Sequence, residues 1–132
     1  MSQRIPEGTV VVVADGGSAR VFTNVGSDRT LQLAQQQRIE VENVDDEGPA
    51  GAVPKDMSES QLDEATFAKQ LAAQLNEGAL NNRYAHLLLV ADPVTLGRIR
   101  PLLHKQTQAR LLGDLAKDLT NAPLEDIQRA LG

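Results

Sequence analysis

The sequence predicts a single α/β domain, residues 1–132, whose five-stranded mixed sheet has the strand order 3-2-1-4-5 and carries helices on its faces. Two apolar runs, over residues 9–14 and 84–91, are continuous rather than alternating, which is typical of strands covered on both faces. A stretch with helical periodicity separates them, and such a crossover requires parallel pairing. The chain has 132 residues, of which 41% are hydrophobic, and this suffices for one core.

The first third of the chain is predicted to form a three-stranded antiparallel meander. The turn formers Asp15-Gly16-Gly17-Ser18 connect the first strand to a second over residues 19–25. We expect this turn to be tight because glycine tolerates positive φ. A second turn, residues 26–29, leads to a third strand over residues 30–44, whose polar content suits an edge or a solvated face.

Residues 45–60, DDEGPAGAVPKDMSES, are predicted to form a mobile loop. They are rich in Gly, Pro, Ser and acidic residues and have little apolar mass to bury. Ser58 or Ser60 is expected to cap the helix that follows, from Gln61 to about Leu80. Apolar residues at helical spacing form one stripe on this helix. The stripe consists of Phe67, Ala68, Leu71, Ala72, Leu75 and Ala79.

The second half of the chain continues the alternation of strands and helices. A helix from about Val94 to Lys105 is predicted, and Pro101 should kink or split it. A last strand over residues 110–119 and a short helix opening at Asn121 follow. The predicted order is therefore βββ-α-β-α-β-α, which corresponds to a ribonuclease-H-like architecture.

The composition excludes several classes of protein. The chain has no cysteine, which excludes disulfides and thiolate metal sites, and only 2% aromatic residues, which makes the core aliphatic. Proteins that bind nucleic acid through their overall charge are usually basic, whereas this chain carries a net charge of −5, so we expect no DNA binding. No apolar run approaches the roughly 20 residues that cross a bilayer, and Met1 is followed by polar residues. We therefore expect a cytoplasmic protein with no membrane contact and no cofactor.

Two carboxylates follow the two apolar strands, and they allow two interpretations. If those strands are parallel neighbours, Asp15 and Asp92 lie at the edge where open α/β sheets bind ligands. They could then hold Mg²⁺ with Glu64 or Asp118 as a third ligand. Alternatively, Asp15 starts an Asx-type turn and Asp92 caps a helix before a proline, which leaves no metal site.

A basic run stands out in this acidic chain. It comprises Arg98, Arg100, His104, Lys105 and Arg110. These side chains could contact phosphate groups or an RNA backbone, or they could simply form a solvated helix face. No spacing of residues in the sequence indicates a catalytic site, and we assign no catalytic residue.

Four stretches occur together in an order that resembles a known family. They are ADGGSARVF (14–22), FAKQLAAQLN (67–76), HLLLVADPVTLGRIR (86–100) and KDLT (117–120). Together they resemble the bacterial host-attachment proteins, described as required for attachment to host cells. Arg20 matches that family's arginine on the second strand. The resemblance makes Asp15, Arg20, Asp92, Lys117 and Asp118 candidates for a crevice or a partner-binding site.

The host-attachment family in turn looks like the middle domain of archaeal and eukaryotic peptide-chain release factors. In those proteins the loop before the first helix carries a Gly-Gly-Gln tripeptide that promotes peptidyl-tRNA hydrolysis. The corresponding loop here, residues 47–56, has Gly48 and Gly51 but no adjacent glycines and no glutamine. The resemblance therefore does not imply that activity.

Three functions follow as expectations. The first is a non-catalytic cytoplasmic interaction or regulatory protein, linked to attachment to host cells, with an unidentified protein partner. The alternative is a ribosome- or RNA-associated protein that resembles release factors and lacks Gly-Gly-Gln. The third is a Mg²⁺- or Mn²⁺-dependent nuclease that uses Asp15 and Asp92.

Overall fold

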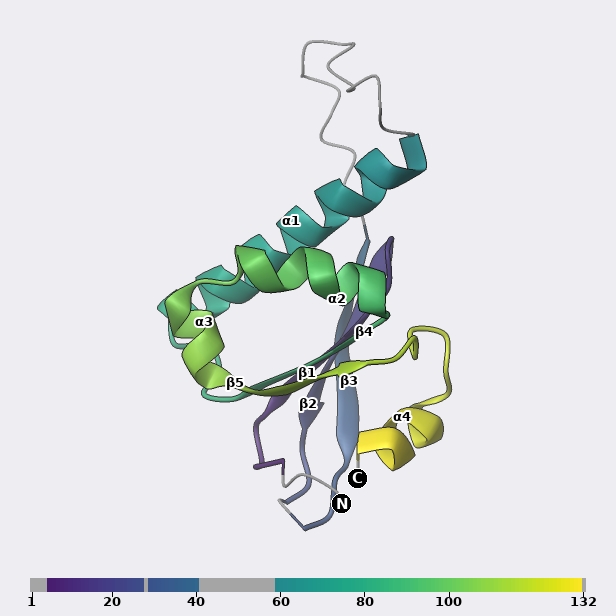
Figure 1. The fold of residues 1–132 in the computed structure, drawn as a ribbon. Helices are drawn as coiled ribbons and strands as arrows, with labels where there is room; N and C mark the ends of the chain where they lie inside the picture. Colours follow the sequence, from purple (N-terminus) through teal and green to yellow (C-terminus); the bar gives the residue numbers. More distant parts are fainter. Residues whose placement is uncertain (1–4, 28, 41–58, 132) are drawn as a thin grey trace.

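The core of the fold is a five-stranded mixed sheet with the order β3-β2-β1-β4-β5, as the sequence predicts (Figure 1). A computed structural model describes residues 5–27, 29–40 and 59–131. The strands are β1 (Val10–Ala14), β2 (Ser18–Asn24), β3 (Leu33–Glu40), β4 (Leu87–Ala91) and β5 (Leu111–Ala116). β1 pairs antiparallel with β2 and parallel with β4, so it lies in the middle of the sheet.

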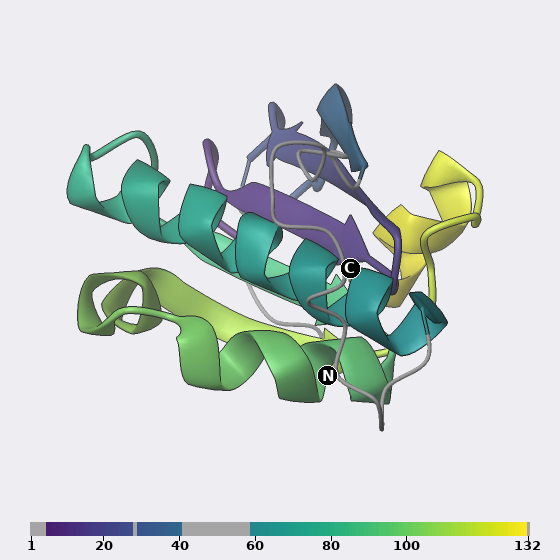
Figure 2. The ribbon, with the colours of Figure 1, turned by 90° about the horizontal axis from the view of Figure 1, so that it is seen from above.

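Helices cover both faces of this sheet. They are α1 (Glu59–Leu80), α2 (Pro93–Ile99), the 3₁₀ turn η2 (Arg100–Leu102), α3 (Lys105–Arg110) and α4 (Leu124–Leu131). Helix α1 packs along α2 and α3 on one face, whereas α4 packs on the other face (Figure 2). None of the helices in these described stretches is long and apolar enough to cross a membrane.

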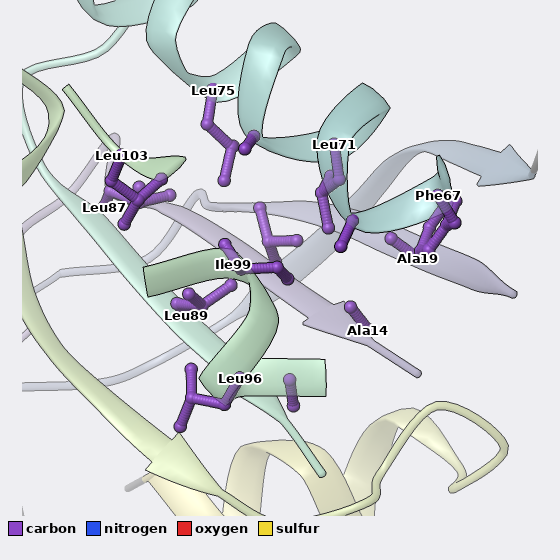
Figure 3. Close-up of a cluster of buried hydrophobic side chains, with 14 of the residues drawn as sticks. Ala14, Ala19, Phe67, Leu71, Leu75, Leu87, Leu89, Leu96, Ile99 and Leu103 are labelled. Atoms are coloured by element: carbon purple, nitrogen blue, oxygen red, sulfur yellow. The ribbon is translucent and has the colours of Figure 1, made fainter. Parts of the chain in front are cut away.

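The core consists of two clusters, one on each face. Because side chains alternate along a strand, Val12 of β1 belongs to the first cluster while Val11 and Val13 belong to the second. In the first cluster, α1 and α2 pack against the sheet (Figure 3). All six residues of the predicted apolar stripe on α1 are buried there. In the second, Ile127 and Leu131 of α4 pack on the opposite face.

The helix predicted from Val94 to Lys105 is divided at Pro101, as expected, but the structure places a separate helix after the break. Proline has no N–H, so α2 cannot continue through it. Asn76 of α1 stabilises the segment between α2 and α3 through side-chain hydrogen bonds. Its side-chain amide donates to Leu102 O at 3.0 Å, and its Oδ1 accepts from His104 N at 2.8 Å and from Thr107 Oγ1 at 2.7 Å.

Several predicted boundaries differ from the structure. The third strand begins at Leu33 instead of residue 30, and the last strand is shorter than the predicted 110–119. Ser60 lies in the first turn of α1 and is not its N-cap, because the helix already begins at Glu59. Ser58, the end of the predicted third strand and residues 45–58 of the predicted mobile loop lie outside the described residues.

Candidate functional site

Two of the residues predicted to form a crevice or partner-binding site follow the carboxyl ends of β1 and β4. These parallel strands are in register, with Ala14 opposite Ala91. Asp15 and Asp92 each follow directly, so the two carboxylates occupy adjacent strand ends. This is the edge at which open α/β sheets bind ligands.

The Asp15 carboxylate closes the turn after β1. Its Oδ1 accepts hydrogen bonds from Gly17 N and Ser18 N, both at 2.8 Å, and from Ser18 Oγ at 3.3 Å. The expectation that glycine would take positive φ in this turn is wrong, because neither Gly16 nor Gly17 has it. The turn is closed by the Asp15 side chain, which acts as in an Asx turn, and by a backbone hydrogen bond from Asp15 N to Ser18 O at 2.9 Å.

Asp92 caps helix α2. Its Oδ2 accepts from Thr95 N at 3.1 Å, and Pro93 occupies the first helical turn, where a missing N–H costs nothing. Both strand-end carboxylates thus bond to backbone N–H groups. Within the described stretches, no group of three His, Cys, Asp or Glu residues is arranged to hold a metal ion.

A charged bridge lies beside the turn. Glu64 of α1 passes so close to Gly16 that a Cβ atom built there would be 2.8 Å from Glu64 Cγ. The Oε1 of Glu64 is 2.8 Å from a terminal nitrogen of Arg98 on α2. The structure therefore pairs Glu64, one of the two possible third metal ligands, with Arg98 of the basic run.

Arg20 connects β2 to the KDLT segment. Its NH1 donates to Ala122 O at 2.8 Å and to Thr120 O at 3.2 Å, and its guanidinium lies 5.0 Å from the centroid of the Phe22 ring. Asp118 accepts from Thr120 Oγ1 at 3.3 Å, while Lys117 is exposed. The structure thus brings together two of the four stretches that resemble the host-attachment family, residues 14–22 and 117–120. Arg20 connects them by its hydrogen bond to Thr120 O.

The other arginines of the basic run also hold neighbouring elements. Arg100 makes two hydrogen bonds to Asp114 on β5, at 3.0 and 2.5 Å, and these raise the pKa of its guanidinium. Arg110 donates to Tyr84 O at 2.6 Å and to Asn82 Oδ1 at 2.8 Å.

Lys105 differs from these arginines. It is exposed, and its side chain makes no hydrogen bond or ion pair to the rest of the described chain. The positive field of the run is therefore weaker than the sequence suggests, because carboxylates partly neutralise it.

A pocket of about 330 Å³ lies elsewhere, between the C-terminal half of α1 and strands β1 to β3. Sequence reasoning missed it, because its walls come from four separate elements. The only local signal is Gly78, a glycine inside a helix, where it is unfavourable unless packing requires it.

Comparison with protein families identifies a match over nearly the whole chain. Residues 8–131 match the family model described as bacterial archaeo-eukaryotic release factor family 12. No curated protein matches the chain.

Proposed function

Because the chain belongs to bacterial archaeo-eukaryotic release factor family 12, we propose that it is a release-factor-like protein that associates with ribosomal RNA in the cytoplasm without hydrolysing peptidyl-tRNA. The observation that carries the proposal is the extent of the match, which includes every strand of the described residues and the whole of α4. The match favours the release-factor-like alternative. It lends no support to a role in host attachment.

The proposal excludes hydrolysis because of the sequence. No Gly-Gly-Gln tripeptide occurs anywhere in the 132 residues. The adjacent pair Gly16-Gly17 lies in the turn after β1 and is followed by serine. A metal-dependent nuclease gains no support either, because Asp15 and Asp92 already accept hydrogen bonds from the backbone.

The surface that would contact RNA must be local, because the chain carries a net charge of −5. Lys105 and Arg100 are exposed and lie at the two ends of the segment that joins α2 to α3. Contacts of this kind release counterions, so the association should weaken steeply as the salt concentration rises.

Co-sedimentation with ribosomes tests the proposal. We expect association at about 50 mM salt and its loss at about 200 mM salt. Lys105→Gln should weaken association at low salt, whereas Lys69→Gln, which removes a charge from an exposed position on α1, should leave it unchanged. An absence of association at every salt concentration would contradict the proposal.

The Arg100–Asp114 pair supplies a matched control. Arg100→Gln and Asp114→Asn both break the same ion pair, but only the first removes a positive charge. If Arg100 contacts RNA, Arg100→Gln should weaken binding and Asp114→Asn should maintain or strengthen it. Equal losses in both variants would instead assign the effect to the local structure of β5. A peptidyl-tRNA hydrolysis assay should give no turnover above background.

A further inference from the structure

The pocket beside α1 has an apolar wall built from distant parts of the chain. Val10 of β1, Val21 of β2 and Ile39 of β3 face it from the sheet, and Leu75 and Tyr84 face it from the other side. The three strand residues are only partly buried, although they pack against the first core cluster. A volume of about 330 Å³ is at the small end of the range for ligand pockets.

Gly78 allows the Tyr84 ring to pack against α1. A Cβ atom built at Gly78 would be 2.8 Å from a ring carbon of Tyr84, so any larger residue would displace the ring. The Tyr84 hydroxyl donates to Leu75 O at 2.6 Å and fixes the ring in place. The wall of the pocket is therefore shaped before any ligand arrives.

The end of α1 fixes the backbone of Arg83 at the pocket. Asn82 has a φ of 55°, and Arg83 N donates to Gly78 O at 2.8 Å while Asn82 N donates to Ala79 O at 3.2 Å. This is the Schellman pattern of helix termination. Arg110 braces the same corner through its hydrogen bonds to Asn82 and to Tyr84 O.

Polar side chains that make no hydrogen bond or ion pair with another described residue line the rest of the pocket. Glu77 and Arg83 are exposed, and neither side chain makes an ion pair or hydrogen bond with any other described residue. The side-chain amides of Gln37 and Gln74 are likewise without partners among those residues. An apolar hollow thus has one negative and one positive group beside it, which are complementary to the two charges of a zwitterion.

We propose that this pocket binds a free α-amino acid with a large apolar side chain. The side chain would lie against Val21, Ile39 and Tyr84, the α-carboxylate would pair with Arg83, and the α-ammonium group would pair with Glu77. The proposal is independent of ribosome association, because none of the pocket residues belongs to the basic run.

Four phenylalanine-like probes test the role of each charge by NMR titration of the ¹⁵N-labelled protein. L-phenylalanine carries both charges, 3-phenylpropionate only the negative charge, phenethylamine only the positive charge, and N-acetylphenylalaninamide neither. L-phenylalanine should bind at least tenfold more tightly than the other three, with shifts concentrated at Val21, Ile39, Gly78 and Arg83. Binding of the uncharged probe with equal affinity, or no binding of any probe, would overturn the proposal.

Two variants assign the charges. Glu77→Gln should weaken phenylalanine about tenfold and leave 3-phenylpropionate unchanged, whereas Arg83→Gln should weaken both. Lys69→Gln, on α1 but outside the pocket, is the control and should alter neither affinity. If 3-phenylpropionate binds as tightly as phenylalanine and only Arg83→Gln weakens it, the pocket recognises a carboxylate alone, as at a peptide C-terminus, and the amino-acid assignment is wrong.

Discussion

Tyr84 is the only tyrosine of the chain, and its side chain is buried between α1 and the sheet. Burial raises the pKa of its hydroxyl above 10.0, and this effect outweighs the opposing influence of Thr107 and Arg110. The neutral hydroxyl donates to Leu75 O, so the folded protein holds this proton more tightly than the unfolded chain does. Ionisation of the Tyr84 hydroxyl should therefore lower the stability of the folded protein.

Titration of the tyrosine absorbance at alkaline pH should give a midpoint above 10. Above pH 10 the unfolded chain has lost a proton that the folded protein retains, so the free energy of unfolding falls as the pH rises. Tyr84→Phe should cost about 1 kcal/mol at pH 7, and this deficit should shrink above pH 10. A deficit that stays constant up to about pH 11 would show that Tyr84 has an ordinary pKa.

Gly16 is required for space rather than for its φ angle. Gly16→Ala should reduce the free energy of unfolding by about 1 kcal/mol, because the new Cβ displaces the Glu64 side chain and disturbs its partly exposed ion pair with Arg98. Gly17→Ala, where a Cβ meets nothing within 4 Å, is the matched control and should stay within about 0.5 kcal/mol. In a Glu64→Ala background the penalty at Gly16 should largely vanish, as chemical denaturation can measure. Equal effects at the two glycines would contradict this reading.

At the scale of elements, α4 is a short helix that depends on the face it covers. Glu125 and Asp126 lie in its first turn, where the helix dipole favours negative charge. Eight residues do not form a stable helix alone in water. Ile127 and Leu131, four positions apart, are buried against the sheet and must supply most of its stability.

Ile127→Ala should therefore destabilise the protein by about 2–5 kcal/mol, since it opens a cavity over the second core cluster. Leu124→Ala on the same helix should cost less, about 1 kcal/mol, because Leu124 is 36% exposed whereas Ile127 is fully buried. Urea denaturation of both variants measures the difference. A small effect at Ile127 would mean that α4 contributes little to the core.

At the scale of the whole molecule, the two core clusters share the same strands. Alternate residues of β1 and β4 face opposite sides of the sheet and belong to different clusters. Disruption of one cluster therefore also displaces the strands against which the other cluster packs. Arg20 adds a long-range contact, because its hydrogen bonds join β2 to residues about a hundred positions later in the chain. These features favour cooperative unfolding of the single domain.

Unfolding should therefore be one transition. Tyr84 absorbance reports on the α1 face, while far-ultraviolet circular dichroism reports on all elements, and their midpoints should coincide. Ile127→Ala, on the opposite face, should lower both midpoints by the same amount. A Tyr84 midpoint that stays at the wild-type value in this variant would show that the faces unfold independently.

The sequence by itself determined the strand order, the crossovers and the stripe of α1 that is buried. These features depend on local periodicity and on the chirality of strand-helix-strand connections, and both can be read from neighbouring residues. The break at Pro101 is local in the same sense, because a proline in the interior of a helix removes a backbone hydrogen bond and interrupts the helix. The helix after that break was not predicted, because Asn76, 29 residues before Lys105, helps to hold the segment that leads into it.

Only the tertiary structure decided what the charged residues do. Arg98 and Glu64 are 34 positions apart and meet because two helices pack side by side, and Arg20 meets Ala122 across 102 positions. The pocket beside α1 likewise needs three strands and the end of a helix in one place. Ion pairs and hollows arise from distances between side chains that are remote in the chain, and no local pattern encodes those distances.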